Sequence, residues 1–371
     1  MPLHEPCFRG NELRYATECI DMGWVSTAGA FVGKFEDALA ESCDARHAVA
    51  TVNGTAALHV ALVALGIGSR DAVICPALTF VATANAISYC GATPLFADSS
   101  HETLGLCPEK LGEFLDRDCD ASSDQLVHRA SGLRIAAIMP VHLFGHPVDM
   151  DKTIALAAKF DIPVIEDATE SLGSYHRNAP TGGLGTVGVL SFNGNKIITS
   201  GGGGGVITND DALAAKIRHL STTARQDRGW QHDHDMVGFN YRMPNLNAAL
   251  ALGQLENLRE FTAAKRQLAE MYRELFAGMD GVDLFSEQSW AKSNYWLNAL
   301  LTQNQSARDA FLDDVNERGI QARPCWRLIS KLSIYRHCPV TDDLKVARDI
   351  ESRLVNLPSS AKLLLPDEGT I

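Results

Sequence analysis

The sequence predicts an α/β protein built on a mostly parallel sheet flanked by helices, with a smaller α+β domain at its C-terminal end. Short apolar runs alternate with helical patterns from residue 47 to residue 223, which is typical of repeated βα units. A chain of 371 residues, 46% of them hydrophobic, is long enough for two cores. A long helical pattern starts at residue 246, so we predict a large domain over 1–245 and a small domain over 246–371.

Helical patterns come first, over residues 11–45, where apolar residues recur at helical spacing. A strand is predicted at 47–52, followed at once by a helix that ends near Gly66. The alternation continues with strands at 73–75, 94–98, 135–141, 162–165, 187–190 and 206–208, and helices at 81–89, 151–160 and 209–223. The stretches 116–132 and 226–235 are polar and irregular, so we predict surface loops there.

The small domain opens on a helical pattern over 246–277. A strand is predicted at 295–300. A helix is predicted at 307–318, with a capping-box-like start at Ser306 and Asp309 and a stop at Gly319. Strands and helices mixed in this way predict an α+β arrangement.

The composition argues against several classes of partner. The formal net charge of −12 disfavours nucleic acids and anionic membranes, because both bind basic surfaces. The nine cysteines occur singly, without a CxxC pair or a zinc-like cluster, so we expect reduced thiols, a cytoplasmic protein and no metal centre. The first residues lack a signal-peptide pattern and no apolar run approaches ~20 residues, so we expect no membrane segment.

A strand, a glycine turn and a helix N-terminus meet at Asn53-Gly54-Thr55-Ala56. Free backbone N–H groups and the positive end of the helix dipole converge at such a point, which makes an anion site. The alternative is an ordinary helix cap formed by Asn53 or Thr55. From this stretch alone both interpretations stand.

Two further residues lie just beyond predicted strands, at the edge where ligands of parallel sheets bind. Phe80 could lie flat against a ring, although a core phenylalanine is the simpler interpretation. Asp167 is a carboxylate that needs a partner, because an unpaired, desolvated charge is unfavourable. It could cap the next helix, bind a metal or pair with a protonated ring nitrogen. No companion ligand cluster supports the metal.

The polar turn at 191–196 presents Lys196 between a strand and the five consecutive glycines at 201–205. A lone loop lysine is usually solvated, but small neighbours would let a bulky ligand approach the backbone. We therefore predict that Lys196 forms a Schiff base with a planar cofactor. The glycines provide either clearance beside that cofactor or a flexible turn between two strands.

Together these four features fit pyridoxal phosphate. Its phosphate binds a helix N-terminus, its ring stacks on an aromatic side chain, its pyridine nitrogen pairs with an anion and its aldehyde condenses with a lysine. The turn at Gly54, Phe80, Asp167 and Lys196 would each supply one of these contacts.

Five sequence blocks resemble the DegT/DnrJ/StrS family of nucleotide-sugar aminotransferases, a branch of the fold-type-I pyridoxal-phosphate enzymes. The blocks are, in order, NGTAALH, PALTFVATANAI, VIEDATESLGS, SFNGNKIITSGGGG and GFNYRMPNLNAA. The likeness runs from about residue 3 to residue 360. The segments SFNGNK, NYWLNALL and NLPSS bring it nearest the subgroup that aminates 4-keto sugars on the way to legionaminic-acid-type and bacillosamine-type sugars.

The resemblance implies a role for each matched residue. Lys196 would carry the cofactor and then move the proton, while Asp167 would hold the pyridinium proton. Phe80 would stack on the ring, and Glu170 would lie near its opposite side or its hydroxyl. The phosphate contacts would be Gly54, Thr55, Ala56 and Ser191, joined by Asn240 from the second subunit of a homodimer. Candidate sugar or nucleotide contacts are His142, Tyr241 and Arg242, the last being a solvated or structural arginine in the alternative interpretation.

The implied reaction transfers an amino group, with glutamate as donor, to a UDP- or GDP-linked 4-keto-6-deoxy sugar in the biosynthesis of cell-surface glycans or nonulosonic acids. Family members with histidine in place of the lysine perform dehydration, so the presence of Lys196 favours transamination. One alternative is a pyridoxal-phosphate sugar dehydratase or lyase on the same scaffold. Another is a non-catalytic regulator that binds nucleotide sugars.

Overall fold

The structure, a computed structural model, describes residues 1–122, 125–228 and 230–365. Its centre is formed by two neighbouring β-sheets that continue into each other. Single β-bridges from Ile138 to Val164 and from Val141 to Asp167 join them. In sheet order the strands are β1 (His47–Thr51), β11 (Gly204–Thr208), β10 (Val187–Ser191), β7 (Ile165–Asp167), β6 (Arg134–Ile138), β2 (Asp71–Pro76) and β3 (Thr93–Ala97). β11 runs antiparallel to both neighbours and the other pairs in this order are parallel, which confirms the predicted mostly parallel sheet.

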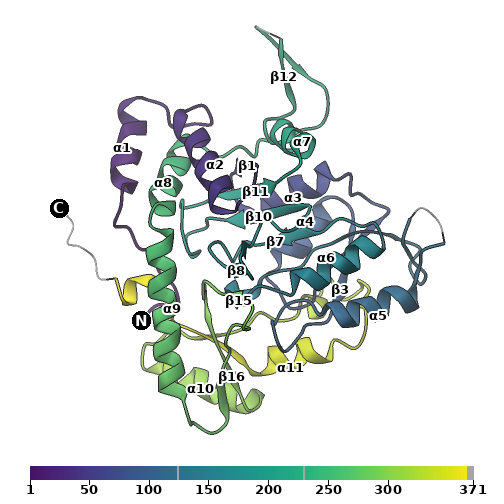
Figure 1. The fold of residues 1–371 in the computed structure, drawn as a ribbon, viewed down its shortest axis with the longest axis vertical. Coiled ribbons are helices and arrows are strands. Elements are labelled where there is room, and N and C mark those ends of the chain that lie inside the picture. Colours follow the sequence, from purple (N-terminus) through teal and green to yellow (C-terminus); the bar gives the residue numbers. More distant parts are fainter. Residues whose placement is uncertain (123–124, 229, 366–371) are drawn as a thin grey trace.

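Helices cover both faces of the sheet (Figure 1). α3 (Gly54–Ala64), α4 (Ala82–Tyr89) and α7 (Asp211–Ser221) share one hydrophobic core with Val49 of β1. α2 (Ala30–Ser42) and α8 (Asn245–Leu255) share another with Ala48 and Ala50 of the same strand. α5 (Pro108–Asp118) and α6 (Met150–Lys159) pack against β2, β3 and β6. Successive strand side chains point to opposite faces, so burial on both sides explains the continuous apolar runs.

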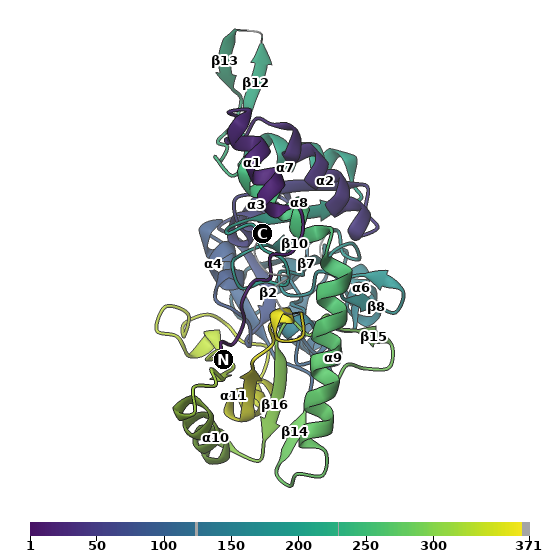
Figure 2. The same ribbon diagram turned by 90° about the vertical axis from the view of Figure 1, so that its left-hand side faces the viewer.

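The C-terminal part lies beyond α9 (Leu258–Phe276), the long helix that runs along the lower left side of the molecule in Figure 1 and faces the viewer in Figure 2. Its antiparallel sheet has the order β14 (Val282–Leu284), β16 (Asn298–Thr302), β18 (Leu354–Leu357) and β17 (Arg323–Pro324). α10 (Gln305–Glu317) and α11 (Lys345–Arg353) accompany it, as expected for an α+β unit. α8 packs against α1 (Glu12–Asp21) and α2, and the division of the chain at residue 245 stays a prediction.

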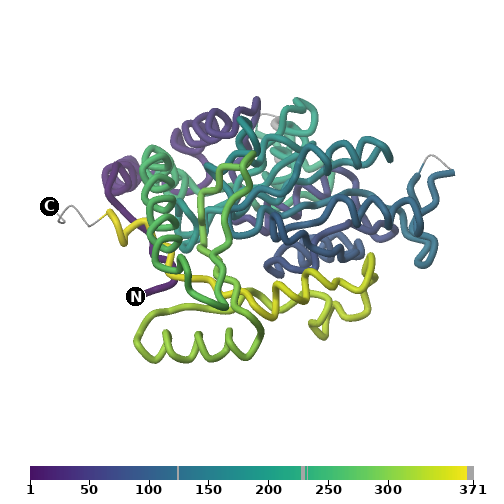
Figure 3. Tube along the Cα trace, turned by 60° about the horizontal axis from the view of Figure 1, so that its bottom comes forward, coloured from purple at the N-terminus to yellow at the C-terminus, as the bar shows by residue number. Residues whose placement is uncertain are grey.

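The first residues lie against the C-terminal part rather than the central sheet (Figure 3). The carbonyl of Met1 accepts the Gln321 N–H at 2.8 Å, and the carbonyl of Leu3 accepts the Ser359 N–H at 2.8 Å. Residues 1–3 are therefore bound by backbone hydrogen bonds to the C-terminal part of the chain.

Short elements complete the described part of the chain. The remaining strands are β4 (Cys119–Asp120), β5 (Val127–His128), β8 (Tyr175–His176), β9 (Ala179–Pro180), β12 (Arg225–Arg228), β13 (Gln231–His234) and β15 (Ala291–Lys292), and the 3-10 turns are η1 (Leu143–Gly145), η2 (Ile329–Lys331) and η3 (Ala361–Leu363). Among the residues described, no helix combines the length and the apolar character that crossing a membrane requires.

Both predicted surface loops contain regular structure. Residues 116–118 are the last turn of α5, and β4 pairs with β5 in the remainder of 116–132, whose residues 123 and 124 lie outside the described part. The stretch 226–235 belongs to the β12–β13 hairpin, which projects from the molecule (Figures 1 and 2); residue 229 lies outside the described part. These pairs are held by backbone hydrogen bonds, so no apolar period in the sequence indicates them.

Three boundaries in the C-terminal part also differ from prediction. The pattern over 246–277 is interrupted between α8 and α9. α10 is capped by Asn304, whose side chain accepts the Ala307 N–H at 3.0 Å, so Ser306 is not the cap. The strand predicted at 295–300 starts only at Asn298, because Tyr295 has a φ of 48°, which an extended strand does not allow.

Candidate active site

A cavity of about 320 Å³ lies where β7 and β10 end. It brings together seven of the residues that the sequence singles out, namely Gly54, Thr55, Phe80, Asp167, Glu170, Ser191 and Lys196. Thr83, Trp296 and Trp326, which the sequence did not single out, complete its walls. The cavity thus collects side chains from both the central sheet and the C-terminal part.

The turn between β1 and α3 forms one end of the cavity. Asn53 has an extended backbone, and its Oδ1 accepts the Ala56 N–H at 2.7 Å, so Asn53 is the cap of α3. Gly54 and Thr55 line the cavity, whereas Ala56 does not. A side chain at Gly54 would place its Cβ 2.9 Å from Ser191 Cβ. The turn is therefore both a capped helix start and a surface of backbone N–H groups beside the Ser191 hydroxyl.

The five glycines at 201–205 do not line the cavity; Gly204 instead packs against the backbone of this turn. Gly204 and Gly205 belong to β11, and a Cβ at Gly204 would lie 2.5 Å from the carbonyl carbon of Asn53. Gly201 has a φ of 76°, which suits the turn into the strand. Clearance is thus required, but it is clearance for the backbone of the β1–α3 turn.

Asp167 ends β7 and is 2% exposed. Thr83 of α4 donates its hydroxyl to Asp167 Oδ2 at 2.9 Å, and the Thr169 N–H donates to Oδ1 at 3.3 Å. Both carboxyl oxygens of Asp167 are thus held in place at the cavity, in a position that suits a ring nitrogen.

Lys196 lies in the turn after β10, with its side chain only 12% exposed. Its Nζ is 3.6 Å from Glu170 Oε1 and 3.9 Å from the centre of the Trp296 ring. Burial lowers the pKa of Lys196, an effect that the charges of Glu170 and Asp167 oppose. Burial also raises the pKa of Glu170 to about 7, against the influence of Lys196. Both groups are thus shifted toward their neutral forms, which makes the amine a better nucleophile near neutral pH.

An aromatic wall faces the lysine. Phe80 is half-exposed at 50%, and its ring centre is 5.9 Å from that of Trp326. Trp326 stacks on Phe144 at 5.1 Å and lies 6.5 Å from Trp296. Phe80 lines the cavity with part of its ring uncovered by other side chains, and the two tryptophans line the same cavity.

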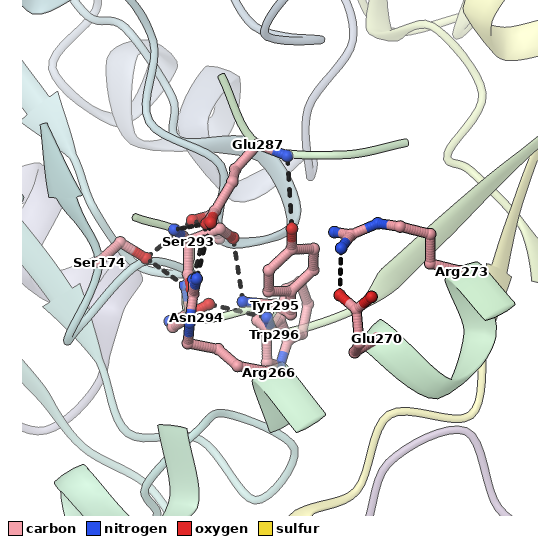
Figure 4. A network of polar contacts seen from close by, with 10 residues as sticks. Ser174, Arg266, Glu270, Arg273, Glu287, Ser293, Asn294, Tyr295 and Trp296 are labelled. Carbon is pink, nitrogen blue, oxygen red and sulfur yellow. Dashed lines mark hydrogen bonds and ion pairs between the residues drawn. The ribbon is translucent and has the colours of Figure 1, made fainter. Parts of the chain in front are cut away.

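A polar network holds Trp296 in place (Figure 4). Asn294 donates its side-chain amide to the carbonyls of Glu170 and Leu172, at 3.0 and 2.9 Å, and its Oδ1 accepts the Trp296 N–H at 2.7 Å. The same loop is fixed by Arg266, which pairs with Glu287. The two hydrogen bonds that the Asn294 amide donates join residues more than 100 positions apart, so no local signal in the sequence could reveal them.

The remaining predicted contacts lie away from the cavity in this chain. His142 is fully buried: its Nε2 lies 2.8 Å from Glu166 Oε1, and its Nδ1 accepts the Val148 N–H at 3.1 Å. Asn240 and Arg242 line a separate hollow of about 500 Å³. Tyr241 packs on Phe239, with its hydroxyl 3.1 Å from His59 Nδ1. A strand end predicts nearness to the ligand edge but not the direction of the side chain, which explains the position of His142.

Metal-like spacing occurs once among the residues described, at Asp98, Asp342 and Asp343. Lys110 pairs with Asp98 and lies 3.7 Å from Asp342. A cation of the protein itself thus occupies this group, and none of its members lines the cavity.

The mostly parallel sheet carries an aspartate at the end of β7 and a largely buried lysine in the turn after β10, and together with the similar solved structures this defines a fold-type-I transferase. The chain belongs to the DegT/DnrJ/EryC1/StrS aminotransferase family, which it matches over residues 6–368. It is therefore an aminotransferase, and the resemblance of the sequence blocks is confirmed.

Named relatives cover almost the whole chain. The GDP-perosamine synthase of Caulobacter vibrioides is 39% identical over 98% of this chain and 94% of the relative. The GDP-perosamine synthase of Escherichia coli O157:H7 is 35% identical over the same shares. Among solved structures, S. venezuelae DesV in complex with a ketimine intermediate is 27% identical and covers 95% of this chain and 90% of its own, with a TM-score of 0.84.

Proposed function

We propose that this chain binds pyridoxal phosphate in the 320 Å³ cavity and uses it to transfer an amino group from glutamate to a nucleotide-linked 4-keto-6-deoxy sugar. The observation that carries the proposal is the convergence of Asp167, Lys196 and the β1–α3 turn on one buried space. The names of two relatives, both GDP-perosamine synthases, support a GDP-linked sugar as the substrate.

The donor set of the cavity fits this cofactor. The N–H groups of Gly54 and Thr55 stand in the first turn of α3, where no intrahelical carbonyl can accept them, so they suit a phosphate together with the Ser191 hydroxyl. Asp167 is ready for a protonated ring nitrogen, and Phe80 offers its exposed face to the ring. When bound, pyridoxal phosphate supplies an aldehyde that condenses with amines and a protonated ring that withdraws electrons.

The residues of the chain then divide the work. Lys196 would hold the cofactor through Nζ, and its amine would act as the base that carries a proton. Glu170 lies 3.6 Å from the Lys196 amine and has a pKa of about 7, so it can donate a proton to that amine or accept one from it. Trp296 and Trp326 line the cavity, and the water that they displace would otherwise weaken the electrostatic interactions inside it.

We further propose that two copies share each site. No arginine, histidine or second lysine lines the cavity among the residues described, so the phosphate would meet neutral donors only. Asn240 and Arg242 instead face the separate hollow, together with Arg218. The phosphate would gain a further contact if the Asn240 of a second copy reached it, which supports a homodimer. The free cysteines agree with the cytoplasmic location that these substrates imply.

Borohydride reduction tests the lysine. After reduction of the purified, cofactor-loaded protein, the peptide that contains Lys196 should carry the covalently attached cofactor. The Lys196→Ala variant should carry no attached cofactor. Lys152→Ala, which removes an exposed lysine paired with Glu109, should retain the attached cofactor. A wild-type protein that carries no attached cofactor after loading at saturation would disprove the assignment.

Product mass tests the substrate. GDP- and UDP-linked 4-keto-6-deoxy sugars are supplied with glutamate, and the product should gain one amino group. A product without new nitrogen would favour a dehydratase or lyase, and no turnover of any keto sugar would favour a binding protein.

Mixing inactive variants tests the shared site. Lys196→Ala and Asn240→Ala, each inactive alone, should regain activity after being unfolded and refolded together, because one hybrid site then holds both native residues. Continued inactivity of the mixture would contradict a shared site.

A further inference from the structure

A basic hollow, separate from the cofactor cavity, lies in the C-terminal part between α10 and α11. These two helices pack side by side (Figure 2). Its volume is about 440 Å³, and it shares no residue with the cofactor cavity. Four cationic residues line it against a single carboxylate, that of Glu351. The four are Arg308, Arg327, Lys331 and Arg348.

Two of the four cations in this hollow have a carboxylate partner, since Arg308 pairs with Asp309 at 2.6 Å and Lys331 pairs with Glu351. Glu351 pairs with Lys331 and accepts the Leu328 N–H at 2.9 Å, so its carboxylate is already engaged. Among the residues described, neither Arg327 nor Arg348 forms an ion pair or a side-chain hydrogen bond. Like charges gathered in one concave surface repel each other, and here they do so in a protein whose net charge is −12. Such a surface is stabilised when an anion enters it.

The ends of the surrounding elements favour the same ligand. Gln305 lines the hollow and is the first residue of α10, which brings the positive end of that helix to its edge. Arg308 is held in place by the Glu351 carbonyl, to which its Nη1 donates at 2.7 Å. A planar guanidinium group can donate two parallel hydrogen bonds to two oxygens of one phosphate.

The hollow is linked to the cofactor cavity through one short segment. Arg327 lines the hollow, and the preceding residue, Trp326, lines the cavity and stacks on Phe144. The segment is tied to the central sheet where the Ile329 N–H donates to the Ala77 carbonyl at 2.9 Å. A ligand that fixes Arg327 would therefore also fix the tryptophan that closes the cavity.

We propose that this hollow binds a diphosphate group through the guanidinium groups of Arg327 and Arg348. Two sources supply that chemistry, the diphosphate of the activated sugar and a free nucleoside diphosphate. The first source rests on the proposed function, whereas the binding of a diphosphate does not.

Calorimetric titration of the cofactor-loaded protein with inorganic pyrophosphate tests the site. We expect binding that weakens with added salt and that falls roughly ten-fold or more in Arg348→Glu, because one guanidinium is replaced by a repelling charge. Lys345→Glu is the matched control: it makes the same charge change on the same helix, at a residue that does not line the hollow. Arg348→Gln replaces Arg348→Glu if the latter does not fold. Equal affinity in wild type and the Arg348 variant, or equal loss in the Lys345 variant, would overturn the site.

Kinetics then separate the two sources. If the diphosphate belongs to the substrate, Arg348→Gln raises the KM for the nucleotide sugar and leaves the KM for glutamate unchanged. In the wild type, pyrophosphate then competes with the nucleotide sugar. If it belongs to a free nucleotide, both KM values stay the same and GDP changes kcat in the wild type only. A protein without transaminase activity that still binds pyrophosphate would refute the proposed function and leave the site intact.

Discussion

Replacing Glu170 by glutamine should make the stability of the cofactor-free protein less sensitive to pH. The folded protein raises the pKa of Glu170 from 4.5 to about 7 through burial. A raised pKa means that the folded state binds the proton more tightly than the unfolded state does. The stabilising contribution is therefore complete below about pH 4.5 and is lost as the pH rises through about 7.

The magnitude follows from that interval. One pKa unit corresponds to about 1.4 kcal/mol, so the rise of Glu170 to about 7 amounts to roughly 3 kcal/mol of unfolding free energy. Glutamine cannot ionise and lacks this term. Urea denaturation at several values between pH 5 and pH 8 should show the variant gaining stability relative to wild type, by up to about 3 kcal/mol.

Glu109→Gln is the matched control, because its carboxylate shifts in the opposite direction. Its hydrogen bond to Lys152 lowers the pKa of Glu109, so that contribution is present above the ordinary value and lost as the pH falls. The side chain is 56% exposed, and solvent screening limits the effect to roughly a few tenths of a kcal/mol. A constant difference between Glu170→Gln and wild type across the pH range would refute the claim that Glu170 is buried beside Lys196 in a proton-favouring environment.

Two matched pairs of variants test the β1–α3 turn. Asn53→Ala removes the cap of α3 and should lower the unfolding free energy by about 1 kcal/mol. Saturating pyridoxal phosphate should restore most of that loss, because its phosphate would bring a negative charge and acceptors to the same helix end, at the Gly54 and Thr55 N–H groups that line the cavity. Asn304→Ala, the equivalent change at α10, should lose the same amount with and without cofactor, and identical behaviour of the two variants in denaturation would contradict the phosphate site. Gly204→Ala should destabilise the protein by about 2 kcal/mol and weaken cofactor uptake, since its Cβ would lie 2.5 Å from the Asn53 backbone. Gly202→Ala, with no atom nearer than 3.8 Å, should change neither property, and a similar effect of both substitutions on uptake would count against this packing.

The sequence was sufficient for the alternation of strands and helices around a mostly parallel sheet, although β7 (Ile165–Asp167) begins where the predicted strand at 162–165 ends. Asp167 follows a short apolar run, and its place at a strand end comes from the same local pattern that predicts the strand. Thr83 and Trp326 could not be predicted in this way, because their role depends on how α4 and the C-terminal part pack around the strand end. His142 shows the reverse case: its strand end was predicted, but its ring turns to Glu166, and no local pattern determines that choice.

The C-terminal part supplies the chemistry of Lys196 as much as the central sheet does. Trp296 covers the amine at 3.9 Å, and the loop that carries this ring is bonded through Asn294 to the carbonyl of Glu170. The loop that follows Asp167 and the loop that carries Trp296 are thus fixed to each other. The burial that lowers the pKa of Lys196 and raises that of Glu170 therefore arises where these two loops meet. A change that separated the loops would return both groups toward water and toward their charged forms. The reactivity of the lysine therefore depends on hydrogen bonds between residues more than 100 positions apart in the sequence.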